Sequence, residues 1–231
     1  MEHETKLLTF PDVLTPDELR ACAADLSAAT WTDGRSTAGS GAVAAKRNEQ
    51  LPAEHPTAQR WGNLILDRLG AHPGFLAATL PLKVLPPMFN RYAGGGTYGE
   101  HVDNAIRALP GTTHRVRTDI SATLFLADPA SYDGGELEIV DTYGGQSIKL
   151  PAGHLVIYPG TSVHRVRPVI RGARLAAVFW IQSLVAADSR RRMLWDLDQA
   201  VQSLTATDAG HPALVGLTGV YHNLLREWSQ T

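Results

Sequence analysis

Three residues of the chain, His101, Asp103 and His164, are of the types that bind catalytic transition metals. Residues i and i+2 of an extended segment point to the same side, so His101 and Asp103 can reach one metal ion. With His164 they supply two imidazoles and one carboxylate, a set that can hold one face of an octahedral iron(II) ion and leave three positions open. A His-x-Asp pair alone is weak evidence, since any of the nine histidines can be a surface or structural residue.

Arg174 strengthens the case for a site, because it lies ten residues after His164 in the apolar stretch 173–181. A buried arginine must be paired, since an uncompensated buried charge costs several kcal/mol. The planar guanidinium fork suits a co-substrate that carries a carboxylate. A structural ion pair with an internal Asp or Glu explains Arg174 equally well at this stage.

Two further stretches are candidates for contact with a substrate. Residues 31–51 begin with a loop rich in Gly, Ser, Thr and Ala, which is either a lid or a structural edge hairpin. Asn104 and Arg107 follow the ligand pair and either face the substrate or are solvated loop residues.

The elements that must position these side chains are mostly short strands. From about residue 83, apolar and β-branched segments alternate with Gly and Pro turns, which is typical of a sandwich or barrel and favours a double-stranded jelly roll. The expected strands cover residues 84–92, 98–102, 118–126, 136–140, 147–150, 154–158, 163–166 and 173–181, after a first short strand within 6–13.

Helices are expected at both ends of the chain. Thr15-Pro16-Asp17-Glu18 predicts a capped helix start, and residues 56–70 have helical spacing that ends at a glycine. Residues 190–204 and 213–228 predict two amphipathic helices, whose apolar faces cover the barrel or form the seam of a homodimer. The fold class is therefore α+β with a mainly β core, divided into an N-terminal support region (1–82), a core (83–183) and a C-terminal helical region (184–231).

Composition limits the possible partners. The chain has 231 residues, 44% hydrophobic and 19% charged, with a net charge of −2, so nothing favours nucleic acid or an anionic membrane as a partner. No secretory signal and no apolar run of about 20 residues is visible. A single cysteine, Cys22, cannot form an intramolecular disulfide, and a cytoplasmic setting is expected.

The motifs resemble a known family. Tyr98-Gly-Glu-His101-Val-Asp103, the strand 118–126, Tyr132-Asp-Gly-Gly-Glu136 and the segment 159–164 are similar to the iron(II)/2-oxoglutarate dioxygenases of the prolyl-hydroxylase type. Arg171-Gly-Ala-Arg174, Phe179-Trp-Ile-Gln-Ser183, the pieces 31–35 and 46–51, and the tail 221–228 narrow the resemblance to the bacterial PKHD-type hydroxylases, the group of the iron-uptake factor PiuC.

The resemblance implies a role for each site residue. His101, Asp103 and His164 match the iron ligands, and Arg174 matches the residue that binds the distal carboxylate of 2-oxoglutarate. A tyrosine before the His-x-Asp pair helps to hold the co-substrate, and both Tyr92 and Tyr98 qualify, Tyr92 being favoured by its place on the preceding strand. The other ring nitrogen of each histidine is expected to meet a carboxylate or carbonyl, with Glu100 and Asp119 nearest in sequence.

The reaction implied is hydroxylation of a C–H bond with release of succinate and CO2, with ascorbate (vitamin C) as the expected reductant. A non-catalytic jelly roll that senses iron or a small ligand is the alternative, and a metal-dependent isomerase or hydrolase would not require Arg174. A peptidyl proline, a free amino acid, a siderophore and a small metabolite are all compatible substrates.

Overall fold

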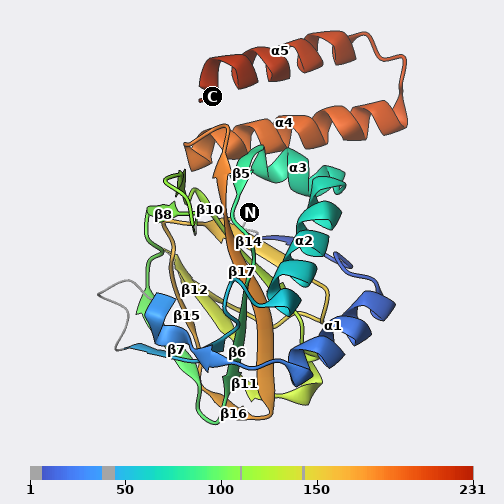
Figure 1. The fold of residues 1–231 in the computed structure, drawn as a ribbon. Coiled ribbons are helices and arrows are strands. Elements are labelled where there is room, and N and C mark those ends of the chain that lie inside the picture. The colour runs from blue at the N-terminus through green and yellow to red at the C-terminus, as the bar shows by residue number, and fades with distance from the viewer. Residues whose placement is uncertain (1–6, 38–44, 110, 142–143, 231) are drawn as a thin grey trace.

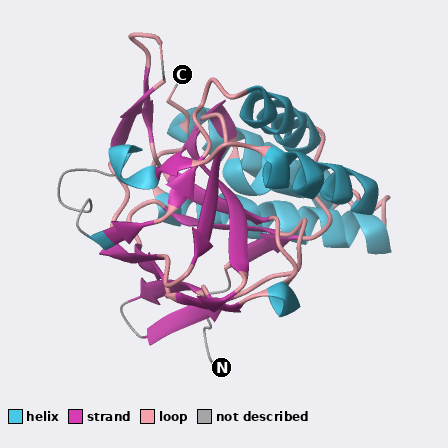
Figure 2. Ribbon diagram, turned by 60° about the horizontal axis from the view of Figure 1, so that its bottom comes forward, coloured by secondary structure: helices cyan, strands magenta, loops and turns pink. Residues whose placement is uncertain are grey.

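The computed structural model describes residues 7–37, 45–109, 111–141 and 144–230. Two antiparallel sheets form the core, three helices cover the larger sheet, and two long helices lie at one end (Figure 1). Seen from another side, the long helices gather on one side of the strands (Figure 2). The predicted α+β class with a jelly-roll core is confirmed.

The larger sheet separates the helices from the site. Its strands lie in the order β1 (Leu8–Phe10), β14 (Leu155–Pro159), β10 (Ile120–Phe125), β17 (Ala173–Ser183), β6 (Met88–Ala93), β4 (Glu49–Gln50) and β2 (Thr32–Asp33), and β5 (Pro81–Val84) also pairs with β17. Alternation along β10 divides its side chains between two faces. Ile120 and Leu124 pack in the core under the helices, whereas Phe125 packs in the cluster shared with the smaller sheet.

The smaller sheet carries two of the three candidate metal ligands. Its strands lie in the order β13 (Gly144–Ile148), β12 (Leu137–Asp141), β15 (Val163–Val166), β7 (Thr97–His101) and β3 (Lys46–Arg47). Two short ribbons complete the strands, β8 (Ile106–Ala108) with β9 (Arg115–Arg117) and β11 (Asp133–Gly134) with β16 (Val169–Arg171). Single turns of 3-10 helix cover Gly34–Thr37 and Pro129–Ser131.

The N-terminal helices begin where side chains cap them. α1 (Pro16–Ala28) has the predicted capping box, in which Thr15 and Glu18 each bond the other's backbone N–H, and α2 covers Pro56–Gly70 as predicted. A short α3 (Pro73–Thr79), not predicted, is capped by the ring nitrogen of His72. Their apolar side chains pack on the outer face of the larger sheet and form the main core of the protein.

The C-terminal helices form an antiparallel hairpin at one end of the barrel. α4 (Asp188–Thr207) extends the predicted helix 190–204 by a few residues, and α5 (Ala213–Trp228) has the predicted bounds. Leu194 is fully buried against Leu80 and Val185, which fixes α4 to the sheet. α5 packs on α4 but has no fully buried residue, and Val215 is 83% exposed.

Two predicted segments differ from the structure. The expected strand 84–92 is broken into β5 and β6, because Pro86 and Pro87 cannot donate to the ladder. The described parts of the stretch 31–51 form short edge strands around a 3-10 turn, and its residues 38–44 lie outside the described residues.

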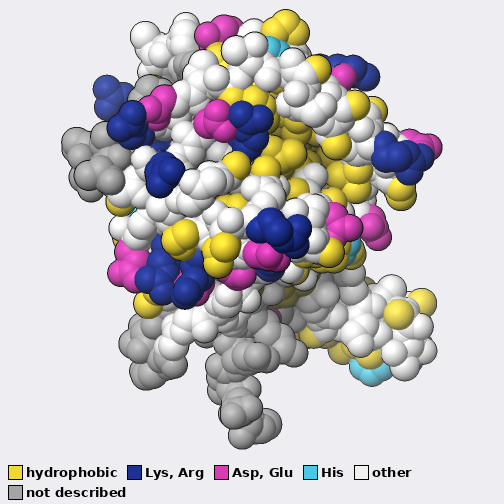
Figure 3. All heavy atoms as spheres, turned by 90° about the horizontal axis from the view of Figure 1, so that it is seen from below, with side chains coloured by type: hydrophobic (Ala, Val, Ile, Leu, Met, Phe, Trp, Pro, Cys, Tyr) yellow, Lys and Arg dark blue, Asp and Glu magenta, His cyan; other side chains and the backbone are white. Residues whose placement is uncertain are grey.

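The surface seen in Figure 3 carries cationic and anionic side chains next to one another rather than in patches of one sign. Ion pairs of the described residues include Arg171 with Asp133 (2.7 Å) and Arg167 with Glu138 (3.0 Å). Within the described part of the chain, no helix combines the length and apolar content needed to cross a lipid bilayer.

Candidate metal centre and its pocket

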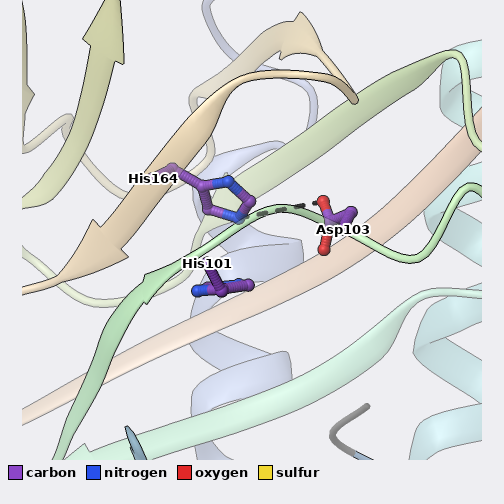
Figure 4. Close-up of side chains that lie close together, drawn as sticks. All are labelled: His101, Asp103 and His164. Atoms are coloured by element: carbon purple, nitrogen blue, oxygen red, sulfur yellow. Dashed lines mark ion pairs between the residues drawn. The ribbon is translucent and has the colours of Figure 1, made fainter. Parts of the chain in front are cut away.

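His101, Asp103 and His164 come together between the two strands β7 and β15. His164 lies opposite His101 in the register of this antiparallel pair, and Asp103 follows two residues after the end of β7. One ligand atom from each residue lies within 4.8 Å of the others, and the three side chains converge in Figure 4. Asp103 Oδ2 is 3.7 Å from His164 Nε2. The arrangement fits a single metal ion bound by two imidazoles and one carboxylate.

A tight turn places His164. A Cβ on Gly160, between β14 and β15, would lie 2.1 Å from the carbonyl oxygen of Thr118, so this turn requires glycine. The strand that follows then pairs with β7 and directs His164 toward His101, with ring centroids 4.2 Å apart.

Hydrogen bonds to backbone carbonyls orient the rings of both histidines. His101 Nδ1 lies 2.8 Å from the Gly99 carbonyl, and His164 Nδ1 lies 3.0 Å from the Ser162 carbonyl. A carbonyl only accepts, so each Nδ1 must carry the hydrogen and each Nε2 keeps its lone pair for a metal.

The expected carbonyl partners are therefore present, but the two carboxylates nearest in sequence are not among them. Glu100 pairs instead with Arg165 (3.0 Å), and Asp119 pairs with Arg117 (2.6 Å). Both side chains are held by these arginines, which removes them from the rings of the histidines.

Sequence reasoning missed Ser121, which donates its hydroxyl hydrogen to Asp103 Oδ2 at 2.6 Å. Ser121 lies on β10 and is buried. Ser121 and Thr123 are polar residues in a strand that the sequence predicts to be buried, and this was the signal that could have identified Ser121.

Burial also affects the protonation of His101. It lowers the pKa of His101 to about 4, and repulsion from His164 acts in the same direction. His101 is therefore neutral near pH 7, which is the form that binds a metal.

The two candidate tyrosines occupy different places. The ring of Tyr98 stacks on His101, with centroids 3.6 Å apart. Tyr92 is fully buried, and the guanidinium carbon of Arg174 lies 5.3 Å from its ring centroid. Burial raises the pKa of Tyr92 to about 12, so its hydroxyl keeps its hydrogen and can donate it. Tyr92 is thus next to the proposed co-substrate anchor, and Tyr98 is next to a proposed metal ligand.

Arg174 carries a buried charge for which the described residues supply no anionic partner. It is only 1% exposed, yet its Nε and Nη1 have no hydrogen-bond partner among the described residues. No carboxylate in this part of the chain forms an ion pair with it, so the structural ion pair considered from the sequence is not present there. Among the described residues, the rings of Tyr92 and Phe125 lie over the guanidinium, each with its centroid 5.3 Å from the guanidinium carbon.

Arg174 and the three candidate ligands line one cavity, together with both tyrosines and Ser121. A ligand carboxylate in this cavity would satisfy the two bare donors of Arg174, which are too costly to leave unpaired. The donor set and the guanidinium therefore fit iron(II) and 2-oxoglutarate as a pair. The same cavity is lined by Arg107, which the sequence offered as a possible substrate contact, and by Lys46, which the sequence did not single out as a site residue.

Comparison with known proteins identifies the family. Residues 87–182 match the model of the 2OG-Fe(II) oxygenase superfamily, and residues 188–230 match that of the PKHD-type hydroxylase C-terminal domain. A PKHD-type hydroxylase of Parvibaculum lavamentivorans is 58% identical over 225 residues, covering 97% of this chain and 100% of the relative. One from Bordetella pertussis is 56% identical over 223 residues, covering 96% and 99%.

Solved structures share the fold at lower identity. A Pseudomonas putida prolyl-4-hydroxylase superposes with a TM-score of 0.53 at 23% identity, covering 77% of this chain and 92% of that one. HygX from Streptomyces hygroscopicus, solved with nickel, 2-oxoglutarate and hygromycin B bound, gives a TM-score of 0.54 at 17% identity, covering 77% and 82%. With the sequence relatives, these findings establish that the chain belongs to the PKHD-type hydroxylases and is a 2-oxoglutarate-dependent oxygenase.

Proposed function

We propose that the enzyme hydroxylates a C–H bond of its substrate, with His101, Asp103 and His164 holding iron(II) and Arg174 holding the distal carboxylate of 2-oxoglutarate. The observation that carries this proposal is the pair of bare donors on buried Arg174, in the same cavity as the three candidate ligands. When bound, iron(II) and 2-oxoglutarate supply the oxidative chemistry: dioxygen and 2-oxoglutarate are consumed, and hydroxylated substrate, succinate and CO2 are formed.

The chain's own residues orient and shield the reactants. Gly99 and Ser162 carbonyls fix the histidine rings, and Ser121 holds one oxygen of Asp103. Tyr92 lies beside Arg174 and is our choice for the tyrosine that helps to hold 2-oxoglutarate. Tyr98 we assign to packing on His101.

Anaerobic addition of iron(II) and 2-oxoglutarate tests the proposal. We expect a weak visible charge-transfer band that is absent in Asp103→Ala and weakened or shifted in Arg174→Ala. Admission of air should then yield succinate. A sensor without catalytic activity would bind iron(II) but form no succinate with any substrate offered, and a protein without the band in the wild type would refute the ligand assignment.

We further propose that ascorbate serves as the reductant and that the enzyme works in the cytoplasm. Free, buried Cys22 supports a reducing compartment. Succinate formation over many turnovers should last longer with ascorbate present, and equal time courses with and without it would remove ascorbate from the scheme.

The α4–α5 hairpin is our proposed surface for homodimer formation. Met193, Val215 and Val220 are exposed apolar side chains on it. Light scattering of the wild type and of Val215→Glu tests this: a dimer that the substitution converts to monomer supports the proposal, and a monomeric wild type refutes it. No contact with nucleic acid or membrane is part of the proposed function.

A further inference from the structure

Two cationic side chains line the pocket in addition to Arg174. Lys46 on β3 is 6% exposed, and Arg107 on β8 lies over the indole of Trp180, with its guanidinium carbon 3.9 Å from the ring centroid. Both line the cavity that contains the candidate metal ligands. They come from different parts of the chain, so the fold, and not a local motif, brings them together.

In a pocket filled by iron(II) and 2-oxoglutarate, the charges of the other groups sum to zero without Lys46 and Arg107. Asp103 is the one carboxylate among the described lining residues. The charges of iron(II) and Arg174 are matched by Asp103 and the two carboxylates of 2-oxoglutarate. Asp33 does not line the pocket, although its negative charge raises the pKa of Lys46. The same carboxylate also forms an ion pair with Arg35 at the surface. The lining of the filled pocket therefore keeps an excess of positive charge.

Placing the buried charge of Lys46 near the partly buried charge of Arg107 costs free energy, because the two repel each other. Burial lowers the pKa of Lys46 to about 8, and the positive charge of Arg107 lowers it as well. Burial also lowers the pKa of Arg107. Among the described residues, Arg107 Nη2 reaches the sulfur of Met88 at 3.8 Å, which is a weak acceptor. An anion bound between the two would relieve their repulsion and give Arg107 a strong acceptor.

The segment that carries Lys46 is held in place by amide hydrogen bonds. Asn48 and Gln50 both donate to Asn90 Oδ1 on β6, at 2.8 and 2.6 Å, and Asn90 donates to the Met88 carbonyl at 2.8 Å. All three amides are buried. These bonds tie the residues just after Lys46 to β6, and Lys46 itself pairs with Tyr98 in the smaller sheet, so sheet structure on both sides positions it, as suits a binding residue.

We propose that Lys46 and Arg107 bind an anionic oxygen group of the substrate, so that the substrate is a small acid, a carboxylate or a phosphate ester, and not an internal residue of a neutral peptide. The proposal rests on the proposed function, because the charge balance assumes that iron(II) and 2-oxoglutarate fill the rest of the pocket. The cationic pair would hold the acidic end while the C–H bond to be hydroxylated faces the metal.

Matched pairs of acids and neutral analogues test the proposal. The anaerobic enzyme loaded with iron(II) and excess 2-oxoglutarate is titrated with N-acetylated glycine, proline and 6-aminohexanoic acid, each as acid and as amide, and with glycerol phosphate, glycerol and inorganic phosphate. The readouts are the change in the charge-transfer band and, in air, succinate. We expect the acids to act at concentrations at least roughly tenfold below those of their amides, as charge-assisted hydrogen bonds predict. The carboxylate and phosphate arms then show which oxygen group the pair prefers.

Variants locate the effect. Lys46→Met and Arg107→Met should each raise the half-saturating acid concentration by about tenfold or more, because each removes one charge-assisted contact. Arg47→Met and Arg115→Met are matched controls, since Arg47 is an exposed neighbour on β3, Arg115 is exposed on the strand paired with β8, and neither lines the pocket.

The outcomes separate the two proposals. An enzyme that forms no charge-transfer band refutes the proposed function and this inference with it. A normal band that no acid or phosphate perturbs at millimolar concentration overturns this inference alone, as do amides that bind as well as the acids. The acid–amide comparison uses the wild-type enzyme, so it decides the matter even if a variant fails to fold.

Discussion

Replacing Arg174 by methionine should remove 2-oxoglutarate binding without unfolding the protein. Two buried N–H groups of the arginine have no hydrogen-bond partner among the described residues. Each such unsatisfied donor costs about 1–3 kcal/mol. Its two cation–π contacts, with Tyr92 and Phe125, stabilise the folded protein by about 1–2 kcal/mol each. The net effect of Arg174→Met on the stability of the unliganded protein is therefore small or stabilising. A structural ion pair would behave in the opposite way, since breaking one costs about 3–5 kcal/mol.

Ligand-linked stability gives the cleanest measurement of this change. At 2-oxoglutarate concentrations one hundred times Kd, binding stabilises the loaded wild type by about 2.7 kcal/mol, or roughly 5–10 °C in Tm for a chain of this size. Loss of a bidentate charged contact weakens binding by about one hundredfold, which reduces the stabilisation to about 0.4 kcal/mol.

Thermal unfolding with a bound divalent metal, with and without 2-oxoglutarate, measures both effects. Arg171→Met is the matched control, because its exposed pair with Asp133 contributes at most about 1 kcal/mol and lies outside the pocket. The reasoning is refuted if Arg174→Met unfolds several degrees below the wild type without ligand, or if it retains the full 2-oxoglutarate shift.

Three further predictions concern other parts of the molecule. Ser121→Ala should weaken iron(II) binding by about 10–100-fold in calorimetric titration while the fold is kept, because Asp103 loses its orienting hydrogen bond; an unchanged Kd would contradict this. Acid binding should weaken as pH rises through about 8, because the pKa of Lys46 is lowered by burial and by Arg107, against the opposing pull of Asp103 and Asp33, and Lys46→Met should lack this dependence in the same band titration. Arg191→Met should lower the free energy of unfolding by about 2–4 kcal/mol in urea, since buried Arg191 donates to the Val185 and Ala186 carbonyls at 2.8 Å, whereas exposed Arg190→Met should change it by less than about 1 kcal/mol.

The sequence was informative where chemistry is local. His101 and Asp103 could be placed on one side of a segment from their spacing alone, and the repeated strands and turns indicated the jelly roll. The helix limits at Thr15 and Gly70 followed from capping rules. These features depend on residues that are neighbours along the chain.

Features created by packing were not predictable. α3 is a seven-residue helix that depends on burial of Phe75 and Ala78, since so short a helix is unstable by itself. The β8–β9 ribbon has little apolar periodicity and is held by distant residues: Val116 packs on Leu85 and Trp180, and Arg117 bonds the Ser183 carbonyl and Gln230. The sequence offered Arg107 as a substrate contact or as a solvated loop residue, and its position on β8 places it in the lining of the pocket.

The same limit applies to the interpretation of Arg174. Sequence placed it on an apolar strand but could not say whether an internal carboxylate paired with it. Only the three-dimensional arrangement shows two donors without partners among the described residues. The role of Lys46 depends likewise on amides that join β4 to β6.

Strand β17 sets a fixed length scale for any ligand in the pocket. Arg174 and Trp180 lie on one face of it, and at about 3.3 Å per residue their Cα atoms are roughly 20 Å apart. Pairing with β10 on one side and β6 on the other prevents the strand from shortening, and a slip of one residue would turn both side chains out of the pocket. The backbone that carries Arg174 and the backbone that carries Trp180 therefore keep a fixed separation whichever ligand is bound. We expect this wall of the pocket to act as a rigid gauge, so that substrates are selected by their own size and not by a strand that adjusts to them.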